Sequence, residues 1–189
     1  MNLRQIIQEE IAHVLREREG LRTLNVFDLD DTLISSTSFT RVFNKRTSER
    51  KKLTPAEFSV YKPDKDDVFD FSEFDRITNG KPISRQFDLF AKLVKLSNAS
   101  KTAILTARGP AATKSIQAFM KKYGISGVEI AAIGTSSHQA KADWIRNQIE
   151  KENFSDVLFI DDAVGNTQAV RKLEKEMPNI NFTIKLAKM

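Results

Sequence analysis

Short apolar segments alternate with amphipathic helical patterns along most of this chain. The apolar segments cover residues 23–29, 101–105, 127–133, 156–160 and 181–185, and the helical patterns cover about 84–98, 110–123, 137–152 and 164–177. The segments are short and carry apolar residues on both faces, which is typical of strands that are buried on both faces. We therefore expect one α/β domain over residues 1–189, a three-layer structure with a mainly parallel sheet of about five strands and helices on both faces.

A helical pattern precedes the first apolar segment. Between Leu3 and Leu15, apolar residues recur at spacings of three and four, which predicts an N-terminal amphipathic helix within residues 1–20 that ends at Gly20. This helix either packs on its own sheet or pairs with a second copy. The chain is therefore expected to be a monomer or a homodimer.

Residues 36–83 interrupt the alternation directly after the first apolar segment. A hairpin strand is expected around Thr40–Phe43. The sequence Thr54-Pro55-Ala56-Glu57 has the pattern of a capping box with proline at the first helical position, so a short helix is expected to run to about Tyr61. We expect the whole segment to be an inserted flap or small cap over one end of the sheet.

Composition narrows the classes of protein to consider. The chain has no cysteine, which excludes a disulfide scaffold, a thiolate metal cage and a cysteine nucleophile. No apolar run is long enough to span a membrane, and the charged N-terminus does not have the pattern of a secretory signal. We therefore expect an intracellular, cytoplasmic protein without a membrane partner.

The net charge of +5 is unevenly placed. Residues 41–65 hold eight basic and three acidic side chains, so this segment alone accounts for the excess. Such a run is either a solvated surface or a patch that attracts a phosphate-bearing or polynucleotide partner. Nucleic acid is therefore an expected partner of the 41–65 segment under the second interpretation.

Polar side chains stand where three of the expected strands end, namely Asp28 with Asp30, Thr106 with Arg108, and Asp161 with Asp162. In a doubly wound, Rossmann-like sheet, ligands bind beyond the carboxyl ends of the strands. Four carboxylates gathered there would repel and raise each other's pKa values unless a cation were present. An all-oxygen ligand set without cysteine or a nearby histidine pair favours Mg²⁺ over Zn²⁺.

These motifs resemble those of the haloacid dehalogenase (HAD) superfamily, whose members are mostly Mg²⁺-dependent phosphatases. The resemblance spans residues 23–166 and rests on four matches in the expected order. They are Asp28-Leu29-Asp30-Asp31-Thr32 after an apolar strand, Thr106 ending a strand, Lys141 at the start of a helix, and the acidic pair Asp161-Asp162 with Asn166 four residues on. In the family, glycine often occupies the position of Asp31. The short insertion resembles those of the small-cap members of the superfamily.

The resemblance implies roles for the carboxylates. Asp28 would attack phosphorus and form an aspartyl-phosphate intermediate, and Asp30 would act as general acid and then general base. Asp28, Asp161 and Asp162 would bind the metal, Asp162 directly or through water, and Asp30 would contribute its backbone carbonyl. A dehalogenase needs no acid at the Asp30 position, so the resemblance favours a phosphatase.

The resemblance also implies supporting roles. Thr106 and Lys141 would bind the phosphate, and Lys141 would also offset the charge of Asp28. Arg108 would be a further phosphate ligand or would pair with an acidic neighbour. Thr32 would support the first turn, and Asn166 would orient the acidic loop. His13 and His138 are expected to be surface or helix-end residues.

The expected function is therefore Mg²⁺-dependent phosphomonoester hydrolysis. A short insertion with a basic segment favours a nucleotide or the phosphorylated end of a nucleic acid as substrate. Small phosphorylated metabolites are the alternative substrate class. Phosphotransfer to an acceptor other than water would use the same residues. A protein with this fold that binds a partner without catalysis is the alternative outside the enzymes.

Overall fold

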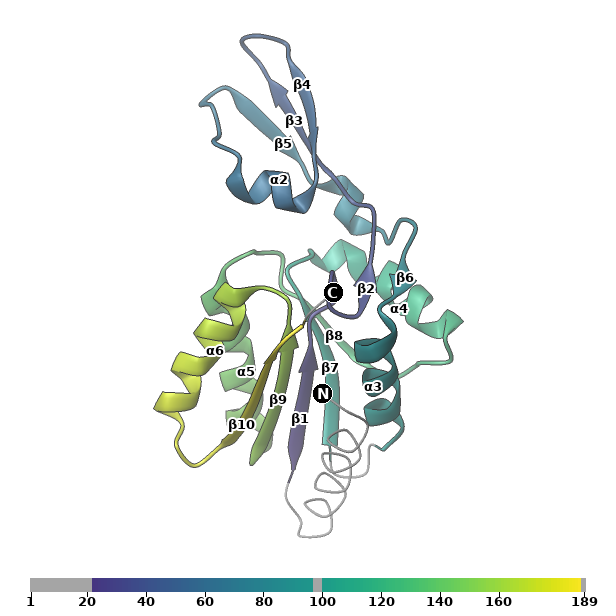
Figure 1. Ribbon diagram of the computed structural model, residues 1–189, viewed down its shortest axis with the longest axis vertical. Helices are drawn as coiled ribbons and strands as arrows, with labels where there is room; N and C mark the ends of the chain where they lie inside the picture. Colours follow the sequence, from purple (N-terminus) through teal and green to yellow (C-terminus); the bar gives the residue numbers. More distant parts are fainter. Residues whose placement is uncertain (1–21, 97–99, 188–189) are drawn as a thin grey trace.

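A parallel β-sheet forms the centre of the protein in the computed structural model, which describes residues 22–96 and 100–187 (Figure 1). Its five strands lie in the order β10-β9-β1-β7-β8. In chain order they are β1 (Thr23–Phe27), β7 (Ser100–Thr106), β8 (Glu129–Ala132), β9 (Asp156–Asp161) and β10 (Asn181–Leu186). All the neighbouring pairs are parallel, as expected from short segments with apolar residues on both faces.

Helices cover both faces of this sheet. On one face, α3 (Ser84–Lys95) and α4 (Thr113–Lys122) pack against a core that contains Phe27 of β1. On the other face, α5 (His138–Glu152) and α6 (Val164–Glu176) pack against a core that contains the preceding residue, Val26. Successive side chains of a strand point to opposite faces, so the apolar run of β1 serves both cores. The expected three-layer α/β architecture is confirmed.

The chain crosses from one face to the other next to β1. The connections through α3 and α4 lie on one face and lead to β7 and β8, whereas those through α5 and α6 lie on the other and lead to β9 and β10. β1 is therefore flanked by strands whose helices lie on opposite faces. In open α/β sheets, ligands bind in a crevice at such a point, which in this sheet lies beyond the carboxyl ends of β1 and β9.

The insertion between β1 and α3 has a sheet of its own. A short antiparallel ribbon of β2 (Ile34–Ser35) and β6 (Lys81–Pro82) joins it to the parallel-sheet domain. Beyond this ribbon, β3 (Thr40–Asn44), β4 (Arg50–Leu53) and β5 (Asp67–Asp70) form an antiparallel sheet in the order β4-β3-β5, followed by the 3₁₀ helix η1 (Ser72–Asp75). In Figure 1 the insertion stands beyond the carboxyl ends of β1 and β9.

The helix α2 (Pro55–Val60) packs on one face of the inserted sheet through Phe58, whose ring lies 5.6 Å from that of Phe69. The expected capping box is confirmed, because Thr54 and Glu57 each accept a hydrogen bond from the other's backbone N–H. The hairpin strand expected around Thr40–Phe43 is also confirmed, whereas β4 and β5 were not expected from the sequence.

The other boundaries differ little from expectation. The helical pattern at 110–123 begins as the 3₁₀ helix η2 (Pro110–Ala112) and continues as α4. The amphipathic helix expected within residues 1–20 lies outside the described residues. Across residues 22–96 and 100–187, no helix has both the length and the apolar character needed to cross a lipid bilayer.

Candidate functional site

Three carboxylates meet at the carboxyl ends of β1 and β9. Asp28 follows β1, and its backbone N–H donates to the carbonyl of Ile160 at 2.9 Å, which continues the pairing of the two strands. Asp161 ends β9 and Asp162 follows it. One carboxylate oxygen from each of the three aspartates lies within 4.8 Å of those of the others. These three residues therefore form a group that can hold a metal ion.

Lys141 connects two of these carboxylates. It lies in the first turn of α5, and its Nζ atom donates to Asp28 Oδ1 at 2.6 Å and to Asp161 Oδ2 at 2.7 Å. All three side chains are buried. Removing the ammonium group or one of the carboxylates would leave a buried charge unpaired, which is strongly destabilising. The structure thus brings Lys141 to the carboxylates.

Asn166 and His138 support Asp161 from the side of α6. The Asn166 amide donates to both carboxylate oxygens of Asp161 at 2.9 Å, and the His138 Nδ1 atom donates to Asn166 Oδ1 at 2.7 Å. The backbone N–H of Ala163 also donates to Asp161, at 2.8 Å. Asn166 was expected to orient the acidic loop, and it contacts Asp161 directly. His138 begins a helix and is exposed, as expected, but sequence reasoning missed its contact with Asn166.

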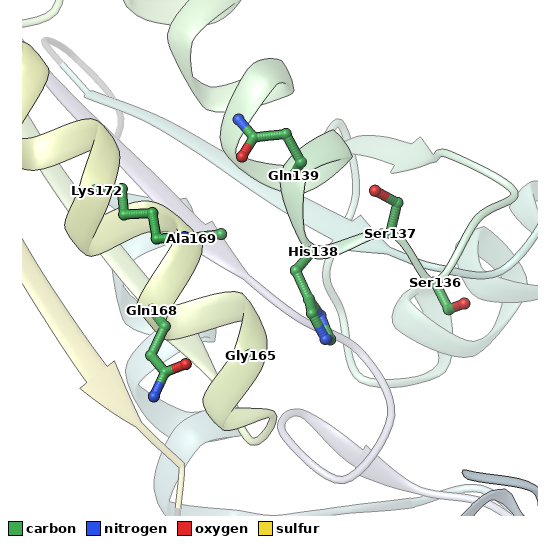
Figure 2. A pocket seen from close by; sticks show the side chains of 8 residues that line it. All are labelled: Ser136, Ser137, His138, Gln139, Gly165, Gln168, Ala169 and Lys172. Carbon is green, nitrogen blue, oxygen red and sulfur yellow. The ribbon is translucent and has the colours of Figure 1, made fainter.

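A polar groove lies between the start of α5 and the first turns of α6, beside this support (Figure 2). Its lining residues are Ser136, Ser137, His138, Gln139, Gly165, Gln168, Ala169 and Lys172. The His138 ring lies against Gly165, where a Cβ atom would fall 2.3 Å from His138 Nε2. A glycine at this position is therefore needed for His138 to reach Asn166. The glycine next to Asn166 is the one feature of the sequence that could have pointed to a side chain packed closely there.

Burial and mutual repulsion shift the ionisation of these groups. Burial raises the pKa of Asp28 to about 7, and the charge of Asp161 adds to this, although Lys141 opposes it. Burial and the charge of Asp161 also raise the pKa of Asp162. Burial acts to lower the pKa of Lys141, but the charges of Asp28 and Asp161 outweigh it and raise that pKa above its ordinary value. The site holds more negative charge than Lys141 balances.

Four carboxylates were expected to gather at this edge, but Asp30 lies outside the group of three that can hold a metal ion, although its charge contributes to the raised pKa of Asp28. The two oxygens of Asp30 accept hydrogen bonds from Arg108, Oδ2 from Nε and Oδ1 from Nη2, both at 2.7 Å. Of the two roles foreseen for Arg108, pairing with an acidic neighbour is therefore the one seen in the structure. Its role as a phosphate ligand and that of the Asp30 carbonyl as a metal ligand remain predictions.

The two predicted threonines belong to the turn after β1 and to the end of β7. Thr32 Oγ1 donates to Asp162 Oδ1 at 3.4 Å, and Thr106 Oγ1 accepts the backbone N–H of Arg108 at 3.2 Å. Both threonines are buried. Asp31, in the same turn as Thr32, has a φ of 55°, in the left-handed region that glycine adopts without steric cost and aspartate tolerates.

Acidic side chains neutralise much of the basic 41–65 segment. Arg41 pairs with Glu73 at 2.6 Å and lies opposite Asp70 in the β3–β5 ladder. Arg46 lies within 4.0 Å of Asp64 and Asp66. The inserted sheet therefore places the acidic stretch of the sequence beside the basic one, and the net positive charge of residues 41–65 is not the local charge of the folded surface.

Comparisons with known proteins found no match for this chain, either among protein-family models or among curated proteins. The geometry of the side chains at the ends of β1, β7 and β9 therefore carries the functional inference.

Proposed function

We propose that this chain is a Mg²⁺-dependent phosphomonoester hydrolase of the HAD type, in which Asp28 forms an aspartyl-phosphate intermediate. The observation that carries this proposal is the position of Asp28. Its carboxylate lies at the end of the central strand, bridged through Lys141 to Asp161 and next to Asp162. A second carboxylic acid, Asp30, follows two residues later in the same turn.

The residues present suit a divalent cation. Asp28, Asp161 and Asp162 together carry three negative charges when ionised, and Lys141 balances one of them. The remaining two charges equal those of Mg²⁺, which prefers carboxylate oxygen ligands. These three aspartates would hold the ion, which would neutralise charge on the phosphoryl oxygens and orient the substrate. Asp30 lies outside this group of carboxylates, and its oxygens accept hydrogen bonds from Arg108.

In the first step, a carboxylate oxygen of Asp28 attacks phosphorus and the bond between phosphorus and the ester oxygen breaks. The leaving alkoxide takes a proton from the Asp30 carboxyl group, so the alcohol departs neutral. Lys141 offsets negative charge on Asp28 and on the phosphoryl group that it accepts. Thr106, at the end of β7 next to β1, would hydrogen-bond a phosphoryl oxygen.

In the second step, water attacks phosphorus of the aspartyl phosphate. The Asp30 carboxylate accepts a proton from the water, and the bond between phosphorus and Asp28 breaks. Inorganic phosphate leaves, Asp28 returns to its carboxylate form, and Asp30 holds the proton for the next cycle. The balance is one ester and one water consumed, and one alcohol and one phosphate formed.

A phosphatase panel tests the proposal. Purified protein is assayed with phosphomonoesters in Mg²⁺ and in chelator, beside Asp28→Asn and an exposed control, Asp88→Asn on α3. The expected result is phosphate release that requires Mg²⁺, persists in Asp88→Asn and is lost in Asp28→Asn. Acid-quenched protein should carry a phosphoryl group on Asp28. Hydrolysis that survives in Asp28→Asn would refute the mechanism.

The phosphorylated end of a nucleic acid, or a nucleotide, is one substrate class, and it is favoured by strand β4. β4 is an edge strand of the insertion, and its cations Arg50, Lys51 and Lys52 are exposed to solvent. Lys51 lies 3.5 Å from Glu49 and Lys52 lies 4.0 Å from Glu73, so Arg50 is the cation of this strand that the experiment targets. Phosphorylated oligonucleotides in the same panel distinguish this class from small phosphorylated metabolites. A nucleic-acid substrate predicts that kcat/KM for the oligonucleotide falls steeply with salt and falls in Arg50→Gln, whereas that for a small ester does not.

A further inference from the structure

Arg108 lies at a junction between the turn after β1 and the insertion. Its side chain is buried, and hydrogen bonds engage all three guanidinium nitrogens. Nε and Nη2 donate to the two oxygens of Asp30 at 2.7 Å. Nη1 donates to the backbone carbonyls of Phe74 and Arg76 at 2.8 Å, and Nη2 also donates to Ser36 Oγ at 3.0 Å.

The contacts of Arg108 reach both ends of the insertion. Ser36 follows β2, where the chain enters the inserted segment, and Phe74 and Arg76 belong to η1 and the residue after it, where the chain returns. Ser36 Oγ closes the arrangement because it also donates to Asp30 Oδ1 at 3.0 Å. Arg108 itself follows β7 of the parallel sheet. One guanidinium group therefore joins the parallel sheet, the insertion and Asp30.

The pairing of Arg108 with Asp30 also fixes the orientation of the Asp30 carboxylate. A guanidinium group that meets a carboxylate through two parallel hydrogen bonds fixes the plane and the direction of that carboxylate, which a lysine cannot do. The backbone connection between the insertion and the parallel sheet is short, since β2 and β6 contain two residues each. A shift of η1 relative to the parallel sheet would therefore act on Arg108, and through it on the direction of Asp30.

We propose that Arg108 is a positioning residue that sets the direction of the Asp30 carboxyl group according to the place of the insertion. The inference rests on the proposed function, since it assigns Asp30 its acid–base task. It gives the insertion a role in the acid–base step. The Asp30 carboxyl group has the direction needed for proton transfer only when Arg108 Nη1 donates to the carbonyls of Phe74 and Arg76.

Leaving-group dependence tests this role. Arg108→Lys keeps the charge but removes the two-pronged geometry, and Arg85→Lys, an exposed arginine of α3, is the matched control. The parameter kcat/KM reports the steps through release of the alcohol. For an alkyl phosphate, whose leaving group needs a proton, Arg108→Lys should lower kcat/KM by about 10-fold to 100-fold. For p-nitrophenyl phosphate, whose leaving group needs none, the loss should stay below about 3-fold.

A direct phosphate-binding role would give a different result. In that case Arg108→Lys would lower kcat/KM by the same factor for both esters, and this outcome would overturn the proposal. Ser36→Ala is the second variant, because it removes a partner of both Arg108 and Asp30 with little risk to folding. It should reproduce the same selective loss for the alkyl ester at a smaller size.

Hydrogen exchange tests the coupling without any enzyme activity, so it still decides the inference if the wild type hydrolyses neither ester. If Arg108 links Asp30 to the insertion, Asp30→Asn and Arg108→Lys should both speed backbone exchange in residues 72–83, by about 3-fold or more. Arg85→Lys should leave it unchanged. Unchanged exchange at 72–83 in Asp30→Asn would show that the two are not coupled.

Discussion

Replacing Lys141 with methionine removes the cation that two buried carboxylates share. Lys141 Nζ lies 2.6 Å from Asp28 and 2.7 Å from Asp161, and its side chain is 4% exposed. Removing one partner of a buried ion pair costs about 3–5 kcal/mol, because the remaining charge is left unpaired. In a chain of this length, that loss lowers Tm by about 6–20 °C.

Lys101 provides the matched control. Its Nζ atom lies 2.6 Å from both Glu129 and Glu152, but its side chain is 22% exposed. Both lysines bridge two carboxylates at similar distances and differ in burial, although Lys101 also donates to Gln148 Oε1 at 2.7 Å. Because solvent screens the exposed group, we expect Lys101→Met to cost about 1 kcal/mol or less.

Urea denaturation of the wild type and both variants, in chelator and in Mg²⁺, measures these free energies. In chelator, Lys141→Met should lose at least about three times as much stability as Lys101→Met. In Mg²⁺ the loss should shrink, because the divalent ion supplies positive charge to the same carboxylates. Equal losses in the two variants would mean that burial does not strengthen the Lys141 contacts, and the reasoning would be wrong.

Three further predictions address other parts of the structure. In chelator, the free energy of unfolding should fall as pH rises from about 4 to about 7, because folded Asp28 (pKa about 7) keeps a proton that the unfolded chain has lost; urea titrations of Asp28→Asn should lack this slope. Gly165→Ala should destabilise the protein by displacing His138, and adding His138→Ala should recover most of the loss in thermal denaturation. Thr54→Ala removes the N-cap acceptor of α2, costs about 1 kcal/mol, and should speed hydrogen exchange at 55–61 about 5-fold; unchanged exchange would contradict it.

The parallel sheet and the carboxylate group were predictable because both follow from local patterns. Apolar segments that alternate with helical periodicity leave few arrangements other than a covered parallel sheet. In such a sheet, residues directly after β1 and β9 must lie at one edge, so Asp28, Asp161 and Asp162 could be placed together from their positions alone. Lys141 was placed by its order in the chain, without any local signal.

The insertion was harder to predict because its strands do not show the pattern of a buried sheet. Arg50-Lys51-Lys52-Leu53 of β4 is exposed along most of its length, and β5 has charged residues at both ends. Tertiary contacts such as that of Phe58 with Phe69 stabilise these strands, and sequence periodicity does not report them. Strand propensity depends on such contacts more than on the strand itself.

The partners of Arg108 were unpredictable for a related reason. Two of its acceptors are the backbone carbonyls of Phe74 and Arg76. Every residue has a backbone carbonyl, so the residue types at these positions give no sign of the contact. Only the folded path of the insertion brings those carbonyls to the end of β7. His138 was missed similarly, since its partner Asn166 belongs to another helix.

The register of β1 has a consequence for how the protein is made. Thr23 lies opposite Ser100 on one side and Asp156 on the other, so both neighbours of the central strand are synthesised long after it. Contacts so distant along the chain are slow to form. During synthesis on the ribosome, Asp28 would therefore emerge before Asp161 and Asp162, and the three carboxylates could come together only after β9 had been translated.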